Sequence, residues 1–230
     1  MQAEDRVIHF CVEMIHPPAP LKRQVLQQVY FDLSQTRVAY DSIDLADMAQ
    51  ARFYSRRGKA QSLIVFLPDR VLMVEEWSDI PLSEFEEKVR VAAPVVLKAR
   101  GAQQVIIHSA TVRSTFALTH YDDARVFLLD NACSLEGHIA PHFKRPIATG
   151  GLRLVFPETN EHPGNLHVNI ESFRHSTNEM FVEVKAIFGR QPVVSSDVAP
   201  IIKNLHETRA FITKRVFPFL QQFDCPQEAP

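Results

Sequence analysis

Two near-continuous apolar stretches, residues 62–67 and 71–77, are separated only by Pro68, Asp69 and Arg70. A turn this short joins neighbouring antiparallel strands. Apolar residues such as Leu63 and Ile64 occupy both faces of each stretch, which predicts central strands that are covered on both sides. The chain therefore needs a sheet of several strands with other elements packed on it.

The same kinds of pattern predict the remaining elements. Short runs of apolar, β-branched and aromatic residues predict strands at 7–14, 52–57, 105–118, 152–156, 166–173 and 180–188. Apolar residues at helical spacing predict helices that start near Pro20, 83, 122 and 197. Ser83 with Glu86 resembles a capping box, Asp197 suits a helix N-cap, and Pro218 is expected to break the last helix.

The order of these elements runs twice through strand, helix, three strands and helix. We therefore predict an α+β fold, an antiparallel sheet with helices on one face and an internal duplication. The first half is expected to span 1–101 and the second 102–224, followed by a tail at 225–230. The two halves are expected to form one compact unit with a curved sheet.

The closing-helix stretch NLHETRAFITKRVFPFL contains Leu205, His206 and Phe211. Together with the order of elements, it resembles a sporadically distributed bacterial family of two-half α+β proteins with no established activity. The resemblance implies a cytoplasmic bacterial protein and assigns no site residues. The chain departs from the family in lacking an aromatic-rich stretch after the central strand.

Composition excludes several classes of protein. Apolar residues make up 46% and charged residues 23% of the 230 residues, as in soluble globular proteins. The formal charge of -2 creates no overall field for nucleic acid or an anionic membrane. No apolar stretch reaches the roughly 18 residues of a membrane span, and the first residues do not resemble a signal peptide. The three cysteines form no CxxC pair, so a reducing cytoplasm is expected.

The usual phosphate and nucleophile motifs are missing. With seven glycines, the chain has no GxGxxG, no GxxxxGK[ST] and no GxSxG sequence. His206 and Glu207 begin an HExxH zinc motif, but Ala210 stands where the second histidine is needed. We therefore expect no cofactor.

Cys133, His138 and His142 are of zinc-ligand type. Gly137 and Pro141 mark the segment as a loop, so helical spacing does not align the two histidines. We favour a polar connection without metal, with a metal site as the alternative.

Glu171 and Glu183 are the weak catalytic candidates. A turn at 176–178 would place them directly across a hairpin, where repulsion between carboxylates raises a pKa. A solvated outer face is the commoner reading of such a pattern.

Two further groups suggest binding. Arg52, Tyr54 and Arg56 alternate onto one strand face, with Arg57 and Lys59 at the turn, so they suit a nucleic-acid backbone or another anion. Alternatively, they guard an edge strand against aggregation. Arg113, His167 and Lys185 are candidates for lining a polar groove, whereas His108 is expected in the core, bonded to a backbone carbonyl.

Taken together, these features favour a non-catalytic binding protein for a partner protein or a ligand. Nucleic-acid binding through residues 52–59 is the alternative, and a carboxylate- or metal-dependent hydrolase is a third reading. The sequence leaves homodimer formation open and indicates no membrane partner.

Overall fold

The computed structural model describes residues 5–135, 139, 143–145 and 147–226. These residues form a nine-stranded sheet in the order β2-β3-β4-β5-β1-β7-β10-β9-β8, in which every pair is antiparallel. The strands are β1 (Asp5–Ile15), β2 (Ser42–Asp44), β3 (Ala51–Arg57), β4 (Ala60–Phe66), β5 (Arg70–Glu76), β7 (Ile107–Ala117), β8 (Gly151–Phe156), β9 (Asn165–Ser172) and β10 (Glu179–Phe188). A small second sheet pairs β6 (Gln104–Val105) with β11 (Val193–Val194).

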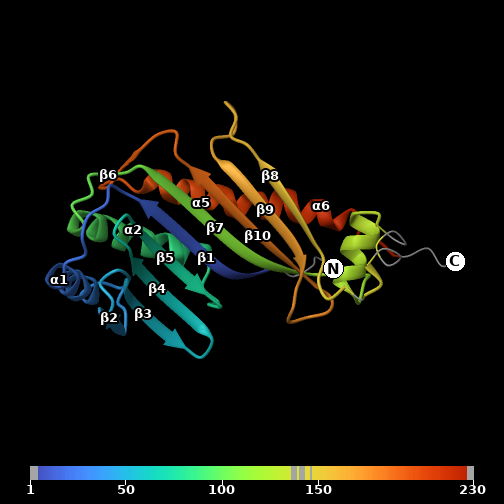
Figure 1. The fold of residues 1–230 in the computed structure, drawn as a ribbon, viewed down its shortest axis with the longest axis horizontal. Coiled ribbons are helices and arrows are strands. Elements are labelled where there is room, and N and C mark those ends of the chain that lie inside the picture. Colours follow the sequence, from blue (N-terminus) through green and yellow to red (C-terminus); the bar gives the residue numbers. More distant parts are fainter. Residues whose placement is uncertain (1–4, 136–138, 140–142, 146, 227–230) are drawn as a thin grey trace.

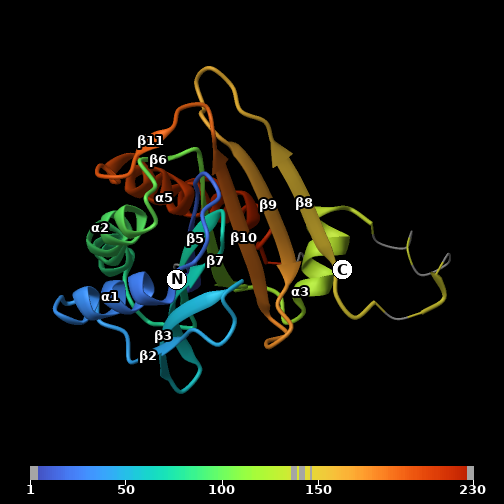
Figure 2. The same cartoon turned by 60° about the vertical axis from the view of Figure 1, so that its left-hand side comes forward.

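Helices pack against one face of the large sheet, as Figures 1 and 2 show. They are α1 (Arg23–Ser34), α2 (Leu82–Ala99) and a C-terminal run of α5 (Ala199–Phe211), the π-helical η2 (Ile212–Val216) and α6 (Phe217–Gln221). A short α3 (Ala124–Val126) with η1 (Phe127–Ala132) lies at one end of the sheet. The core between sheet and helices contains fully buried aromatic residues, among them Phe53, Phe66, Phe85 and Phe116. The predicted α+β fold with an antiparallel sheet is therefore confirmed.

The two predicted halves share one sheet, because β1 and β7 pair with each other at its centre. From there the order is β5-β4-β3 on one side and β10-β9-β8 on the other. Within the large sheet, each half thus contributes its first strand to the centre, and the last strand of that half lies next to it. This correspondence concerns topology alone, so duplication of the chain stays a prediction, as do the limits of the two halves.

The structure corrects several helix ends. The N-cap of α2 is Pro81 and has no side-chain cap, so the predicted capping box at Ser83 is wrong. α1 begins after Lys22, with Pro20 outside it. Pro218 lies inside α6 and does not break the helix, since α6 continues directly from η2. A proline is tolerated where a new first turn begins.

The predicted cover on both faces of the central apolar strands is also wrong. Ile64, Phe66, Val71 and Met73 face the helices and are buried. Their neighbours on the other face are only half buried, namely Leu63, Val65, Leu72 and Val74. An antiparallel sheet often leaves one face open, and we call this face of the nine-stranded sheet the open face.

Candidate binding face

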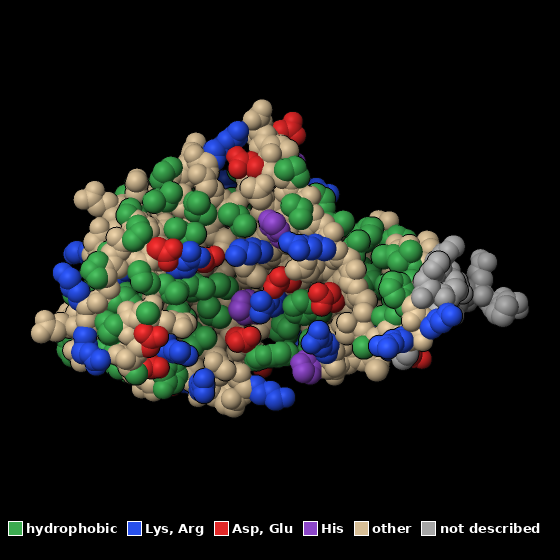
Figure 3. All heavy atoms as spheres, in the orientation of Figure 1, with side chains coloured by type: hydrophobic (Ala, Val, Ile, Leu, Met, Phe, Trp, Pro, Cys, Tyr) green, Lys and Arg blue, Asp and Glu red, His purple; other side chains and the backbone are tan. Residues whose placement is uncertain are grey.

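The open face carries a polar centre on β1, β7, β10 and β9. Side chains alternate between the two faces of a strand, so every second residue of these strands points away from the helices. The polar residues placed there by the strand registers are His9, Glu13, Ser109, Thr111, Arg113, Glu183, Lys185, His167, Asn169 and Glu171. Figure 3 looks onto this face and shows acidic, basic and histidine side chains gathered across its middle.

Glu183 is held by two neighbouring strands. Arg113 on β7 donates from Nε to Oε2 of Glu183 at 2.6 Å. Asn169 on β9 donates from Nδ2 to the other carboxylate oxygen at 3.1 Å. The pairs Arg113–Glu183 and Asn169–Glu183 are directly opposite in the ladder, so sheet register alone brings the three groups together.

Glu13 is the second anchored carboxylate. It accepts from Arg70 Nη1 at 2.7 Å, from Ser109 Oγ at 3.2 Å and from Lys185 Nζ at 3.5 Å. Burial alone would raise the pKa of Glu13, but the hydrogen bond from Arg70 and the charge of Lys185 lower it overall. The carboxylates of Glu13 and Glu183 are thus both paired with cations of the same face.

Two potentially reactive groups on β1 are made inert by burial. Burial, and next the charge of Glu13, raises the pKa of the Cys11 thiol to about 12, so no thiolate nucleophile exists at neutral pH. Burial, followed by the charge of Arg113, lowers the pKa of His9 to about 4. The buried Nδ1 of the neutral His9 has no hydrogen-bond partner among the described residues.

An aromatic corner borders this polar centre, formed by Trp77, Phe173, His175 and Phe181. Trp77 comes from the first half of the chain and lies with its ring centre 6.4 Å from Phe173 and 6.1 Å from His175. Phe173 in turn stacks on Phe181 at 6.3 Å. The corner therefore bridges the two halves of the sheet on its open side.

The backbone at Trp77 is strained. Its φ of 53° lies in the left-handed region, which bulky residues rarely adopt. The Trp77 amide donates to the carbonyl of Ile8 at 2.8 Å, which fixes this conformation at the end of β5. Trp77 remains 37% exposed in spite of its ring contacts. Backbone strain of this kind clusters at functional sites, where the surrounding structure maintains it.

A hollow of about 390 Å³ opens beside the aromatic corner. Phe173 and His175 line it on one side, and Asp123 and Arg125 line it as well. Asp123 accepts from Arg125 Nη2 at 2.5 Å. The hydrogen bonds from Arg125 lower the pKa of Asp123 to about 2. The hollow thus combines aromatic walls with an ion pair that is already formed.

The predicted contact between Glu171 and Glu183 is wrong. Glu171 lies opposite Phe181, and Glu183 lies opposite Asn169. The hairpin turn is longer than expected, because the Phe173 amide donates to the carbonyl of Glu179 and closes a turn over 174–178. The register is therefore shifted by two residues, which keeps every side chain on its predicted face and changes its partner.

The other predicted binding residues fall on the same open face. Arg113 and Lys185 belong to the polar centre, and His167 lies opposite Lys185. Arg52, Tyr54 and Arg56 lie on β3, where the Arg56 guanidinium is 5.7 Å from the centre of the Tyr54 ring. Arg52 is 3.7 Å from Asp44 on β2, which covers β3 as the true edge strand. Arg57 and Lys59 are exposed at the turn.

Of the three candidate metal ligands, the structure describes Cys133. Cys133 is half buried at the end of η1, whereas His138 and His142 lie outside the described residues. Within the ranges that the structure describes, no three His, Cys, Asp or Glu side chains are grouped to hold a metal ion.

His108 lies in the core as predicted, but its partner differs. Its Nε2 is 2.8 Å from Nδ2 of Asn204 on α5, and its ring stacks on Phe188 at 5.2 Å. Burial lowers the pKa of His108 to about 4, so a neutral Nε2 accepts from the amide. These residues adjoin a pocket of about 530 Å³ on the helix side of the sheet, which neither Glu171 nor Glu183 lines.

Trp77, Phe173, His9 and Glu13 were not predicted as site residues. A signal existed for His9 and Glu13, since they alternate with Phe10, Val12 and Met14 along β1. No comparable pattern marks Trp77, because its position depends on strand order and on an unusual backbone angle.

Comparison of the sequence with protein-family models and with curated proteins finds no match. Of the helices in the described part of the chain, none has the length and apolar character that crossing a bilayer demands. Function must therefore be inferred from the side chains themselves.

Proposed function

We propose that this is a non-catalytic binding protein that holds a partner protein against the open face of its sheet. The observation that carries the proposal is the aromatic corner: a strained, partly exposed Trp77 beside a hollow and a polar centre. Trp, Tyr and Arg dominate binding energy at protein interfaces, particularly beside pockets that take an anchor side chain. The hollow of about 390 Å³ has room for such an anchor.

Paired charges support binding over catalysis. Glu183 is engaged by Arg113 and Asn169, and Glu13 is engaged by Arg70. The Cys11 thiol stays protonated because burial raises its pKa to about 12. A general base needs a free lone pair directed at its substrate, and these groups direct theirs at protein donors.

The same pairing argues against the nucleic-acid alternative. Lysines and arginines that bind nucleic acid neutralise its phosphates and thereby release the counterions condensed on them, so they need to be available to the phosphates. Of the candidate cations on β3, Arg52 lies within 4 Å of Asp44, and Arg70 and Arg113 elsewhere on the face are likewise paired with carboxylates. Arg56, Arg57 and Lys59 are the exposed cations of the candidate strand. A surface with interspersed charges of both signs is better suited to a protein partner, for which it sets specificity.

The test compares the partners that three forms of the protein retain from the cytosol of cells that naturally produce it. The forms are the wild type, Trp77→Ala and the control Val194→Ala, which alters a 59% exposed residue on β11. A partner retained by the wild type and the control is then purified. We expect Trp77→Ala to weaken its binding at least about tenfold, as at an interface hot spot.

Equal affinity of the wild type and Trp77→Ala for the purified partner would contradict the proposal. Binding of an oligonucleotide that weakens steeply with salt and is lost in Arg52→Ala/Arg56→Ala would instead support the nucleic-acid alternative.

A further inference from the structure

The two edges of the sheet are built differently. At one edge lies β2, which is only three residues long. Beyond the end of β2, the neighbouring strand β3 carries the exposed Arg56 and Arg57. Short edge strands and charges prevent strand pairing between molecules. At the other edge β8 has six residues, GLRLVF, with one charge and no proline. Figure 2 shows β8 at the outer margin of the sheet.

The pairing of β8 with β9 determines which backbone groups of β8 are left free. The Ser172 amide donates to the carbonyl of Gly150 at 3.2 Å, just before β8 begins. Inward and outward groups alternate along an antiparallel strand. Leu152, Leu154 and Phe156 therefore bond to β9, while Gly151, Arg153 and Val155 direct their amides and carbonyls outward. Within the described residues, no loop or helix backbone bonds to these outward groups.

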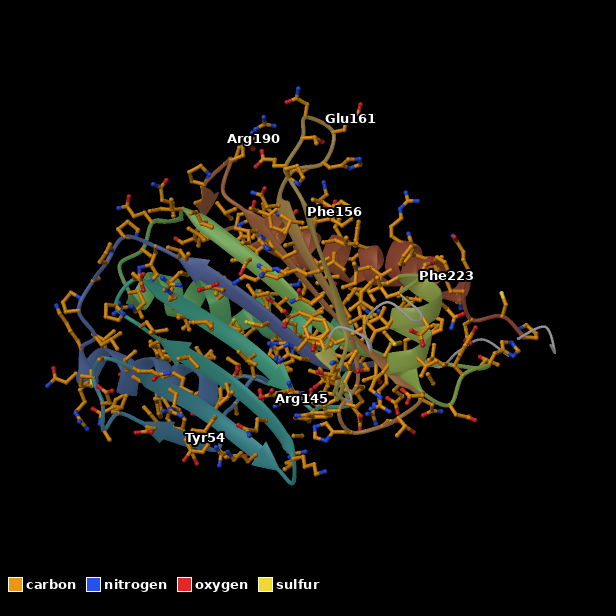
Figure 4. The ribbon with its side chains drawn as sticks, turned by 45° about the vertical axis from the view of Figure 1, so that its right-hand side comes forward. Tyr54, Arg145, Phe156, Glu161, Arg190 and Phe223 are labelled. Atoms are coloured by element: carbon orange, nitrogen blue, oxygen red, sulfur yellow. The ribbon has the colours of Figure 1, made fainter. Side chains whose placement is uncertain are left out.

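The side chains of β8 are also incompletely covered. Val155 is 55% exposed on the open face. On the helix side Phe156 remains partly exposed although it contacts Phe211 at 5.8 Å. Figure 4 shows Phe156 at the β8 edge of the sheet, far from Tyr54 near the opposite edge. An apolar strand with a free edge is a template on which a further strand can pair.

We propose that a second copy of the chain pairs with this edge, β8 against β8 in antiparallel orientation, with the two-fold axis at Leu154. In this register Arg153 lies opposite Val155 of the other copy, and their outward groups form about four ladder hydrogen bonds. Leu152 then faces Phe156 and Leu154 faces its counterpart, which extends the apolar helix-side layer. Shifting the axis to Arg153 would place two like charges directly opposite, which destabilises a strand pair.

The pairing is tested by sedimentation velocity across protein concentrations. The wild type is expected to reach twice the 26.2 kDa mass of one chain. Val155→Pro removes an outward amide without touching the bonds to β9, so it should weaken dimer formation at least about tenfold. Val155→Lys serves the same purpose if the proline variant fails to fold, and Val194→Lys is the matched exposed-valine control. A monomeric wild type, or a dimer unaffected by both Val155 variants, would overturn the proposal.

Disulfide trapping tests the register. In a Cys133→Ser/Cys225→Ser background, Leu154→Cys should form a covalent dimer on oxidation, because the two residues meet at a non-hydrogen-bonded position with close side chains. Arg153→Cys should not. Rapid trapping through position 153 and none through 154 would overturn the proposed two-fold axis.

Discussion

Arg113 and Glu183 lie directly opposite each other on β7 and β10, with Nε and Oε2 2.6 Å apart. Both also act on His9, which lies opposite Arg113 on the other side of β7. The positive charge of Arg113 lowers the pKa of His9 and the negative charge of Glu183 raises it, in addition to the larger effect of burial. The pair thus adjusts, after burial, the pKa of His9 on the open face.

The first prediction concerns the pKa of His9. Arg113→Gln removes the charge that lowers this pKa and should shift it upward, whereas Glu183→Gln should shift it further down. The measurement is a pH titration of the histidine Cε1–H resonances by NMR, with the exposed His162 as an internal reference. Shifts in the same direction in both variants would show that the pair does not control His9.

The second prediction concerns stability against pH. Burial lowers the pKa of His108 from 6.5 to about 4. Between pH 6.5 and pH 4, His108 therefore binds a proton in the unfolded chain but stays neutral in the folded state. The contribution of the neutral His108 to stability is fully present above pH 6.5. It should fall on the order of 3 kcal/mol as the pH drops towards 4.

His108→Gln isolates this effect, because a glutamine keeps an acceptor for Asn204 and does not titrate. Urea unfolding between pH 4 and 7.5 should show a flatter dependence for the variant than for the wild type. Parallel curves would mean that His108 is protonated equally in the folded and unfolded states.

The third prediction concerns the backbone at Trp77. Glycine adopts a positive φ without strain, whereas alanine does not. Trp77→Gly should therefore unfold at higher urea concentration than Trp77→Ala, with a difference of about 1 kcal/mol in the free energy of unfolding. Both variants lose the same ring contacts. An alanine variant as stable as the glycine variant would indicate an ordinary backbone conformation at this residue.

The fourth prediction concerns a buried ion pair on the helix side of the sheet. Glu75 is only 3% exposed and accepts from Lys88 Nζ at 2.7 Å and from Ser62 Oγ at 2.5 Å. Lys88→Met leaves the carboxylate without its counter-charge and should cost about 3 kcal/mol in the free energy of unfolding. The double variant Glu75→Gln/Lys88→Met should recover most of this loss, and urea unfolding measures both. A double variant no more stable than Lys88→Met alone would contradict the assignment.

Sequence patterns predicted most strands because apolar runs and period-two alternation are local features. The same alternation correctly placed Arg113 and Glu183 on the polar side of their strands. It did not predict that they would meet, because β7 and β10 are neighbours only through a sheet order that departs from chain order.

The hairpin between β9 and β10 shows where local reasoning fails. The predicted turn was two residues shorter than the turn in the structure, so the predicted register was shifted by two residues. A shift of two residues leaves every side chain on the same face, so the alternation of apolar and polar residues does not reveal it. The shift nevertheless decides which residues lie opposite Glu171 and Glu183. Trp77 is a harder case, since its left-handed φ is unfavourable for its residue type and arises from the bond to Ile8.

The most direct test of the proposed function is photo-crosslinking in cells that naturally produce the protein. A benzoyl-phenylalanine replaces Phe173 in the aromatic corner, or Phe31 on α1 as an exposed control on the helix side. Binding at the open face predicts a light-dependent adduct with one partner protein from position 173, absent when Trp77 is also replaced by alanine, and none from position 31. An adduct from position 31 alone, or none from either position, would contradict it.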